Sequence, residues 1–261
     1  PSRGLGDVYK RQEPDVPINE RPEIDRWILS ELNTLVKNVN ESFEEYEPTK
    51  AGRLIQTFVI DNMSNWYVRL NRKRFWVSSM SKDKISAYQT LYTCLETVAK
   101  LIAPIAPFYA DRLYMDLINT TGRDNVKSVH LSRFPEFKEE LCDKELEQRM
   151  TLAQQITSMV LSLRKKEKII VRQPLQCISI PYTDNVQKER IESMKQLILD
   201  EVNVKELKFV EGEGMLVKKV KCNFRVMGKK FGKMMKAVAD AVAAMAVSYT
   251  HLRAHETDSY L

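Results

Sequence analysis

Residues 65–76, NWYVRLNRKRFW, bring together the two kinds of side chain that bind single-stranded nucleic acid. Four cations fall within six residues with no acid among them, and aromatic residues flank them on both sides. The cations are Arg69, Arg72, Lys73 and Arg74, and the aromatic residues are Trp66, Tyr67, Phe75 and Trp76. Cationic groups contact phosphates, whereas unpaired bases stack on aromatic rings or on guanidinium planes. The segment is therefore a candidate RNA-binding surface.

The same residues also admit a purely structural interpretation. A tryptophan on a helical stripe is usually a core residue, so Trp66 and Trp76 could both be buried while the arginines solvate the opposite face. Composition alone leaves the two interpretations open for this segment.

The formal net charge of +6 conceals a strong segregation of charge along the chain. Residues 20–47 hold eight acids against three bases, whereas two further basic clusters lie towards the C-terminus. Residues 164–172 contain five bases and one acid, and residues 215–239 contain eight bases and no acid. Such clusters favour a polyanionic partner, although for the last one a solvated face is the favoured alternative.

Several kinds of site are excluded by what the chain lacks. His130 is the only histidine before residue 251, and no glycine-rich phosphate loop precedes a helix. The four cysteines, at positions 94, 142, 177 and 222, are too far apart for the usual zinc-ligand spacing, so we expect reduced, mostly buried thiols. No apolar run approaches the roughly 20 residues of a membrane-spanning helix. We therefore expect no catalytic, cofactor or metal site in this chain and no membrane span.

A mostly helical fold must position the basic segment. Only 8 of the 261 residues are glycine and 10 are proline, which leaves few turn-forming residues to join many short strands. Apolar residues recur at helical spacing over about residues 24–43, 48–76, 81–102, 108–118 and 139–168. Pro104 and Pro107 must break the third of these helices from the fourth. The pattern predicts an antiparallel helical bundle with short connections.

The pattern changes after Arg172. Residues 176–181 alternate like a short strand, 186–202 form an amphipathic helical pattern, and 204–211 alternate again, with 214–221 as a possible third strand. This order predicts a small α+β module. We thus expect a bundle over residues 13–168 and the module over 169–246. Residues 1–12 and 247–261 lack apolar periodicity and resemble translated sequencing adapters, so we expect them to be disordered, on a fragment of a longer protein.

Several separated motifs resemble one family in the right order. NWYVRLNRKRFW, DKISAYQTLYTCLETVAKLIAPIAPFYADRLY and SVHLSRFPEF resemble the helical anticodon-binding domain of class I aminoacyl-tRNA synthetases of the isoleucine, valine and leucine group. VRQPL, LILDEVNVKELKFV and NFRVMGKKFGKMMKAVA resemble the C-terminal part of the isoleucine branch. The resemblance extends over about residues 13–245.

The resemblance implies an ATP-dependent ligase that charges isoleucine tRNA, acts as a cytoplasmic monomer and has its catalytic and editing domains upstream. ATP and Mg²⁺ are implied for the full-length enzyme, with no cofactor in this fragment. The zinc-binding cysteine cluster of some relatives is missing, either because the protein is of the zinc-free type or because of truncation. The implied tRNA contacts are Asn65, Trp66, Arg69, Arg72, Lys73, Arg74, Trp76, Arg172, Gln173, Lys229, Lys230 and Lys233.

Three alternatives remain open at this point. The chain could be the same region of a valine or leucine enzyme, or a non-enzymatic helical adaptor whose acidic first helix docks a protein. It could also be a membrane-surface module that uses residues 229–245, a basic and then apolar stretch.

Overall fold

The computed structural model describes residues 14–122, 126–182 and 184–211. They divide into two compact units. The first unit ends at Met159 and the second begins at Val160, within one long helix. The predicted domain limits stay predictions, and both chain ends, the possible third strand and the last basic cluster lie outside the described residues.

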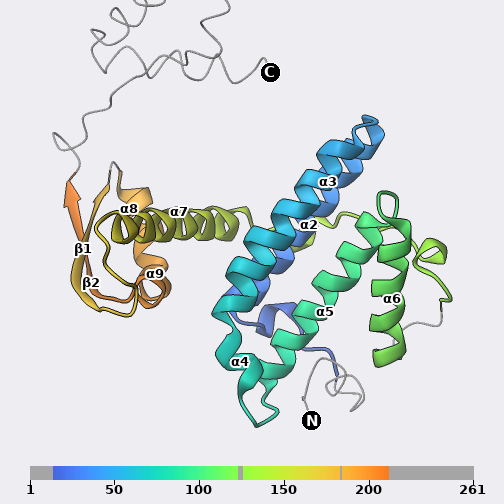
Figure 1. Cartoon of the computed structure of the whole chain (residues 1–261), viewed down its shortest axis with the longest axis horizontal. Coiled ribbons are helices and arrows are strands. Elements are labelled where there is room, and N and C mark those ends of the chain that lie inside the picture. Colours follow the sequence, from blue (N-terminus) through green and yellow to red (C-terminus); the bar gives the residue numbers. More distant parts are fainter. Residues whose placement is uncertain (1–13, 123–125, 183, 212–261) are drawn as a thin grey trace, which may run out of the picture. The chain divides into compact units, whose positions relative to one another are not determined.

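The first unit is the expected helical bundle (Figure 1). Its longer elements are α2 (Glu23–Glu44), α3 (Pro48–Thr57), η2 (Phe58–Val68), α4 (Arg72–Trp76), α5 (Lys82–Ile102), α6 (Pro107–Thr121) and the first part of α7 (Lys144–Lys166). Short 3-10 turns occur at η1 (Ile18–Glu20), η3 (Val129–Leu131) and η4 (Glu139–Leu141). Helix α2 packs against α3, η2 and α5, and α5 packs against α6.

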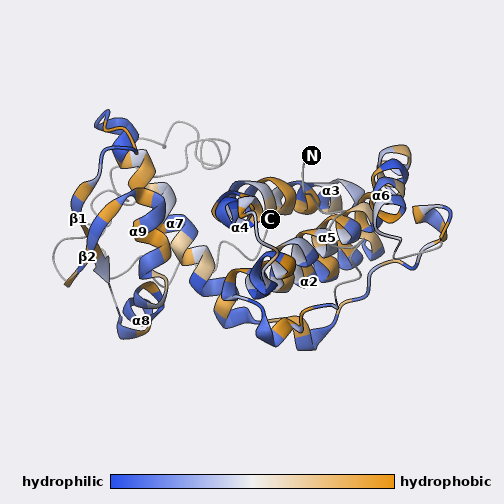
Figure 2. Ribbon diagram, turned by 90° about the horizontal axis from the view of Figure 1, so that it is seen from below, coloured by the Kyte–Doolittle hydropathy of each residue, from blue (hydrophilic) through white to orange (hydrophobic). Residues whose placement is uncertain are grey.

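Helices α2, α5 and α6 begin close to where the sequence predicts, whereas α7 begins at Lys144 rather than near residue 139, where the chain forms the 3-10 turn η4. Ser81 caps α5, since its side chain accepts a hydrogen bond from the backbone N–H of Lys84 at 3.2 Å. Helix α5 ends at Ile102 and α6 begins with Pro107, which confirms the predicted break. Gly122 terminates α6 in the left-handed conformation that glycine adopts at little cost. In Figure 2 each of these helices carries both hydrophobic and hydrophilic residues, as amphipathic packing requires.

The expected single helix over residues 48–76 is instead three consecutive elements. After α3 the backbone forms eleven residues of π-helix, η2, before a turn at Asn71 leads into α4. The buried side chains of this segment are Phe58, Met63, Trp66 and Tyr67. The consecutive residues Trp66 and Tyr67 thus both lie in the core.

The second unit is the expected small α+β module. It contains β1 (Leu175–Tyr182), α8 (Asn185–Ser193), α9 (Lys195–Val202) and β2 (Val204–Glu211). The two strands are parallel, with Ile178 opposite Leu207, because the helices carry the chain back to the same end of the sheet. The predicted continuous helix is interrupted at Met194. The buried apolar side chains of the two helices include Ile191 on α8 and Ile198 and Val202 on α9.

Candidate RNA-binding surface

Helix α4 presents three of the sequence-predicted side chains to solvent. Arg72 and Lys73 are exposed, and the side chain of Trp76 is 79% exposed, which is far from the core position that a tryptophan usually takes. We call Arg72, Lys73 and Trp76 the α4 face. It combines two exposed cations with one exposed aromatic ring on a single short element.

A buried ion pair fixes α4 in place. Arg74 donates from Nη1 to Oδ1 of Asp25 at 2.7 Å and from Nη2 to Oδ2 at 2.9 Å, and its Nε donates to Asp83 at 3.0 Å. Asp25 lies on α2 and is fully buried. The two parallel hydrogen bonds to Asp25 form the bidentate geometry that holds a guanidinium most firmly.

Asp25 is the centre of a larger network. Its carboxylate also accepts hydrogen bonds from the hydroxyl of Tyr67 at 2.8 Å and from that of Ser86 at 2.6 Å. Burial and the neighbouring Asp25 carboxylate raise the pKa of Tyr67 well above its usual value. The hydrogen bonds of Arg74 to Asp25 and Asp83 outweigh the opposing effect of burial, which is the largest single contribution, and raise the pKa of Arg74. The network thus consists of one carboxylate, one permanent cation and two neutral hydroxyl donors.

Further contacts hold the other side of the segment. The rings of Phe75 and Tyr88 lie 5.1 Å apart between centroids, and the Tyr88 hydroxyl donates to the carbonyl of Phe75 at 3.4 Å. The ammonium of Lys84 donates to the carbonyl of Val77. With Arg74 and Phe75 turned inward, Trp76 is left on the outside.

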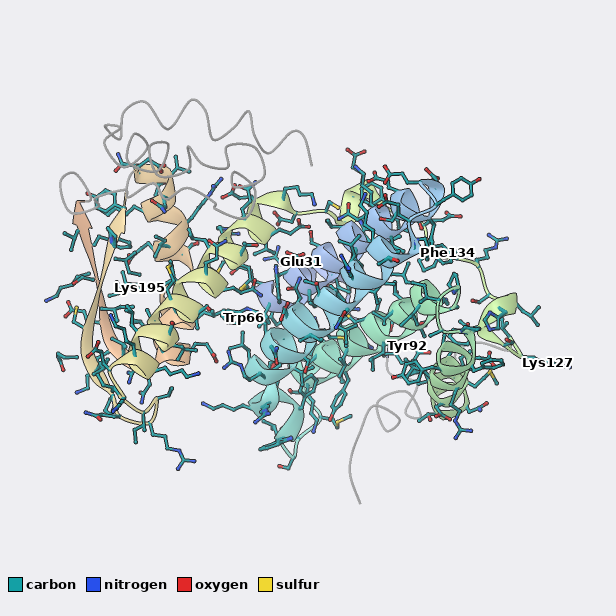
Figure 3. All side chains as sticks on the ribbon, turned by 45° about the horizontal axis from the view of Figure 1, so that its top comes forward. Glu31, Trp66, Tyr92, Lys127, Phe134 and Lys195 are labelled. Carbon is teal, nitrogen blue, oxygen red and sulfur yellow. The ribbon has the colours of Figure 1, made fainter. Side chains whose placement is uncertain are left out.

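The structure removes two predicted contact residues from the surface. The side chain of Trp66 is only 5% exposed, and its Nε1 donates to the sulfur of Met150 at 3.2 Å (Figure 3). The guanidinium of Arg74 donates hydrogen bonds to Asp25 and Asp83. We therefore correct both assignments: Trp66 is a core residue, and Arg74 anchors the α4 face from within.

Asn65 and Arg69 continue the exposed surface along the end of η2. Both are exposed, and Nε of Arg69 donates to the carbonyl of Asn65 at 2.9 Å. The guanidinium of Arg69 also lies 5.8 Å from the centre of the Trp66 ring. This contact directs Arg69 across the helix surface rather than into the core.

In the second unit Arg172 and Gln173 are exposed on the loop between α7 and β1. Another member of the same basic cluster holds this loop: Arg164 is buried and donates to the carbonyls of Ile170, Gln173 and Asn203 at 3.0–3.1 Å. Asn203, in a left-handed conformation, donates to the carbonyl of Val171 at 2.9 Å. Lys229, Lys230 and Lys233 lie outside the described residues.

Sequence reasoning missed Asp25 and Arg164 as anchors. Asp25 does carry a signal, since it stands three and seven residues before Ile28 and Leu32 on the buried stripe of α2. A carboxylate at such a position requires a partner. Arg164 follows Val160 by four residues but lies in a run of bases, which hides it.

Cys94 is buried, Cys142 and Cys177 are half-buried, and all three are free thiols. Within residues 14–122, 126–182 and 184–211, no cluster of three or more His, Cys, Asp or Glu side chains could hold a metal ion. None of the helices in those ranges is sufficiently long and apolar to cross a membrane.

The fold and the exposed basic surface agree with the comparisons to known proteins. Residues 25–179 match the family described as the anticodon-binding domain of tRNA ligase, and the chain belongs to this family. Its relatives include the isoleucine–tRNA ligases of Bacteroides fragilis, 70% identical, Bacteroides thetaiotaomicron, 68% identical, and Porphyromonas gingivalis, 56% identical. Each match covers 240 residues, which is 92% of this chain but only 21% of the relative. The chain therefore spans about a fifth of the length of these relatives.

Proposed function

We propose that this chain provides tRNA recognition to an isoleucine–tRNA ligase, an ATP-dependent aminoacyl-tRNA synthetase. The observation that carries the proposal is the α4 face. There Trp76 is 79% exposed to solvent, and it lies on the same short helix as the exposed Arg72 and Lys73. The high identity to isoleucine–tRNA ligases supports the choice of amino acid.

Each side chain of the surface has a distinct role in this proposal. Arg72 and Lys73 neutralise phosphates, and Trp76 stacks on an unpaired base. Asn65 and Arg69 extend the phosphate contacts along η2. In the second unit Arg172 contacts phosphate and Gln173 offers paired donor and acceptor groups to a base edge. The Lys229, Lys230 and Lys233 group adds a further, non-specific attraction.

The remaining features of the whole ligase are also proposals. We propose that ATP and Mg²⁺ act in parts of the ligase outside this chain, and that this chain itself is non-catalytic and holds neither a cofactor nor zinc. We further propose a monomer that acts in the cytoplasm, away from membranes.

Binding of purified isoleucine, valine and leucine tRNAs to the chain, measured by fluorescence anisotropy over a range of salt concentrations, tests the proposal. Isoleucine tRNA should bind most tightly, and the logarithm of the affinity should fall with the logarithm of salt concentration by about 0.7–0.9 for each neutralised phosphate. Tighter binding of valine or leucine tRNA would assign the chain to the corresponding enzyme instead. Absence of RNA binding would favour a protein adaptor, and binding only to anionic vesicles would favour a membrane-surface module.

A further inference from the structure

The loop between α7 and β1 carries Arg172 and Gln173 on a backbone that apolar packing does not hold. The two residues before them are hydrophobic but lie outside the core: Ile170 is 67% exposed and Val171 is 45% exposed. Arg172 and Gln173 are exposed as well. The conformation of the loop therefore depends on its hydrogen bonds.

Arg164 holds both ends of this turn. Its Nη1 donates to the carbonyl of Ile170 at 3.1 Å and to that of Gln173 at 3.0 Å. The backbone N–H of Gln173 also donates to the carbonyl of Ile170 at 3.1 Å, which closes the turn. Because a peptide group is planar, each of these hydrogen bonds restricts a whole peptide plane. The planes that follow Ile170, Arg172 and Gln173 are thus held without the side chain of Asn203.

Asn203 holds the one plane of the turn that remains. Its Nδ2 donates to the carbonyl of Val171 at 2.9 Å, and the peptide plane that follows Val171 leads directly into Arg172. With this bond, both planes that flank Arg172 are restricted. The direction in which the side chain of Arg172 leaves the backbone is restricted with them.

The backbone at the end of α9 does not by itself require an asparagine. Asn203 adopts the left-handed conformation, with φ of 51°, and its N–H donates to the carbonyl of Leu199. Glycine is the most common residue at such a position. The carbonyl of Asn203 accepts from Arg164 at 3.0 Å and from the N–H of Leu175 at 3.2 Å, and glycine would supply the same carbonyl. What asparagine adds is therefore the side-chain donor to Val171.

We propose that Asn203 is a positioning residue for tRNA recognition, which acts through Arg172 and Gln173 rather than by a contact of its own. It presets the loop, so that these two side chains meet the RNA without first being ordered. Preorganisation of this kind raises affinity, because less conformational freedom is lost on binding. The inference rests on the proposed function, in which Arg172 and Gln173 contact tRNA.

Asn203→Gly tests this role, because glycine adopts the same left-handed backbone and keeps every backbone hydrogen bond. The hydrogen bond that is lost is exposed, so thermal melting should remain close to that of the parent chain. The affinity for isoleucine tRNA, measured by fluorescence anisotropy, should fall about 2- to 10-fold, as expected when one or two side chains must be ordered on binding. Asn203→Asp also tolerates the left-handed backbone but has no N–H donor, and it should lose at least as much affinity.

A double-mutant cycle separates positioning from a general structural role. The reference is a chain with Arg172→Ala and Gln173→Ala together. In this background Asn203→Gly should cause no further loss of tRNA affinity, because the residues through which it acts are gone. Gln196→Ala, which removes an exposed side-chain amide from α9, is the matched control and should bind as the parent chain does.

Nitrogen-15 relaxation reports on the loop directly, without RNA. The order parameter of the Arg172 amide should lie near the rigid value of about 0.85 in the parent chain and fall towards about 0.6 in Asn203→Gly. The amide of Ile198, in the core on α9, should keep its order parameter in both proteins.

The outcomes distinguish this inference from the proposed function. Unchanged affinity or an unchanged order parameter in Asn203→Gly overturns the inference, even when salt-dependent tRNA binding remains. An equal loss with and without the side chains of Arg172 and Gln173 also overturns it, since it would show a structural role alone. If removal of both side chains leaves the affinity unchanged, the inference and this part of the proposed function fall together. Absence of tRNA binding by the parent chain overturns both in full.

Discussion

The two units hold their exposed basic segments by arginine anchors of different kinds. In the bundle, Arg74 meets the fully buried carboxylate of Asp25 and forms a bidentate ion pair. In the second unit, Arg164 donates only to three backbone carbonyls. In both cases one cation of a basic cluster is turned inward, and its neighbours, Arg72 and Lys73 or Arg172, are left exposed for a ligand.

The two anchors differ in how firmly they hold their segments in place. The ion pair of Arg74 couples two charges. Removal of Arg74 leaves the fully buried carboxylate of Asp25 without a counter-charge, and removal of Asp25 leaves Arg74 with only the half-exposed Asp83 as its ionic partner. The carbonyls around Arg164 are neutral dipoles, and those of Ile170 and Asn203 also accept from backbone amides, so loss of the arginine leaves no unpaired charge. The α4 face should therefore be the more firmly built of the two surfaces.

The largest effect is expected from Asp25→Ala. Removal of one partner of a buried ion pair typically costs about 3–5 kcal/mol, and Tyr67 and Ser86 would lose their acceptor as well. Urea unfolding followed by tryptophan fluorescence measures this loss for the bundle alone, because Trp27, Trp66 and Trp76 all lie in the first unit.

Asp83→Ala is the matched control, since Asp83 pairs with the same guanidinium but is half-exposed. An exposed pair contributes about 0–1 kcal/mol, so this variant should unfold close to the parent chain. Equal losses for the two aspartates would contradict the assignment of Asp25 as the anchor.

Arg164→Ala is expected to have an intermediate effect, confined to the second unit. The buried guanidinium makes three hydrogen bonds to carbonyls, and a hydrogen bond to a charged group contributes about 1.5–3 kcal/mol, so the free energy of unfolding should fall by about that amount. Hydrogen exchange should speed up at Gln173 and Leu175, whose amides donate to carbonyls held by this network. Lys165→Ala, at an exposed neighbouring position, should change neither; similar acceleration there would show that Arg164 is not the anchor.

A further effect concerns Glu31 and depends on pH. Burial, followed by the negative charge of Glu147, raises its pKa from 4.5 to about 7, so between these values the folded chain binds more protons than the unfolded chain. The stabilising contribution of the protonated group is thus lost as the pH rises through this window. Glu31→Gln should flatten this decline, so that the variant gains stability relative to the parent from pH 5 to pH 8. Melting curves of the parent chain and the variant at these pH values measure the effect. If the difference in stability between the two proteins were the same at pH 5 and at pH 8, the raised pKa of Glu31 would be refuted.

Much of the fold, but less of the surface, could be predicted from the sequence. Apolar periodicity and the positions of Ser81 and Pro107 are local signals, and they indicated the bundle, the start of α5, the break between α5 and α6 and the α+β order correctly. The π-helix η2 was missed because its buried residues also fit a regular helical stripe over short stretches. A core position of Trp66 was one of two interpretations that its helical stripe left open, and its contact with Met150 decides between them. The inward turn of Arg74 depends on Asp25, which lies far away in the sequence, so no local pattern could reveal it.

One comparison tests the central claim that the α4 face binds tRNA: the affinity for isoleucine tRNA and the melting temperature are measured for Trp76→Ala and Trp66→Ala. Loss of base stacking should cost Trp76→Ala about 1–3 kcal/mol of binding free energy with an unchanged melting temperature. Trp66→Ala should instead lose about 3–5 kcal/mol of folding stability, as expected for a buried aromatic residue. Unchanged tRNA affinity in a folded Trp76→Ala chain would contradict the account.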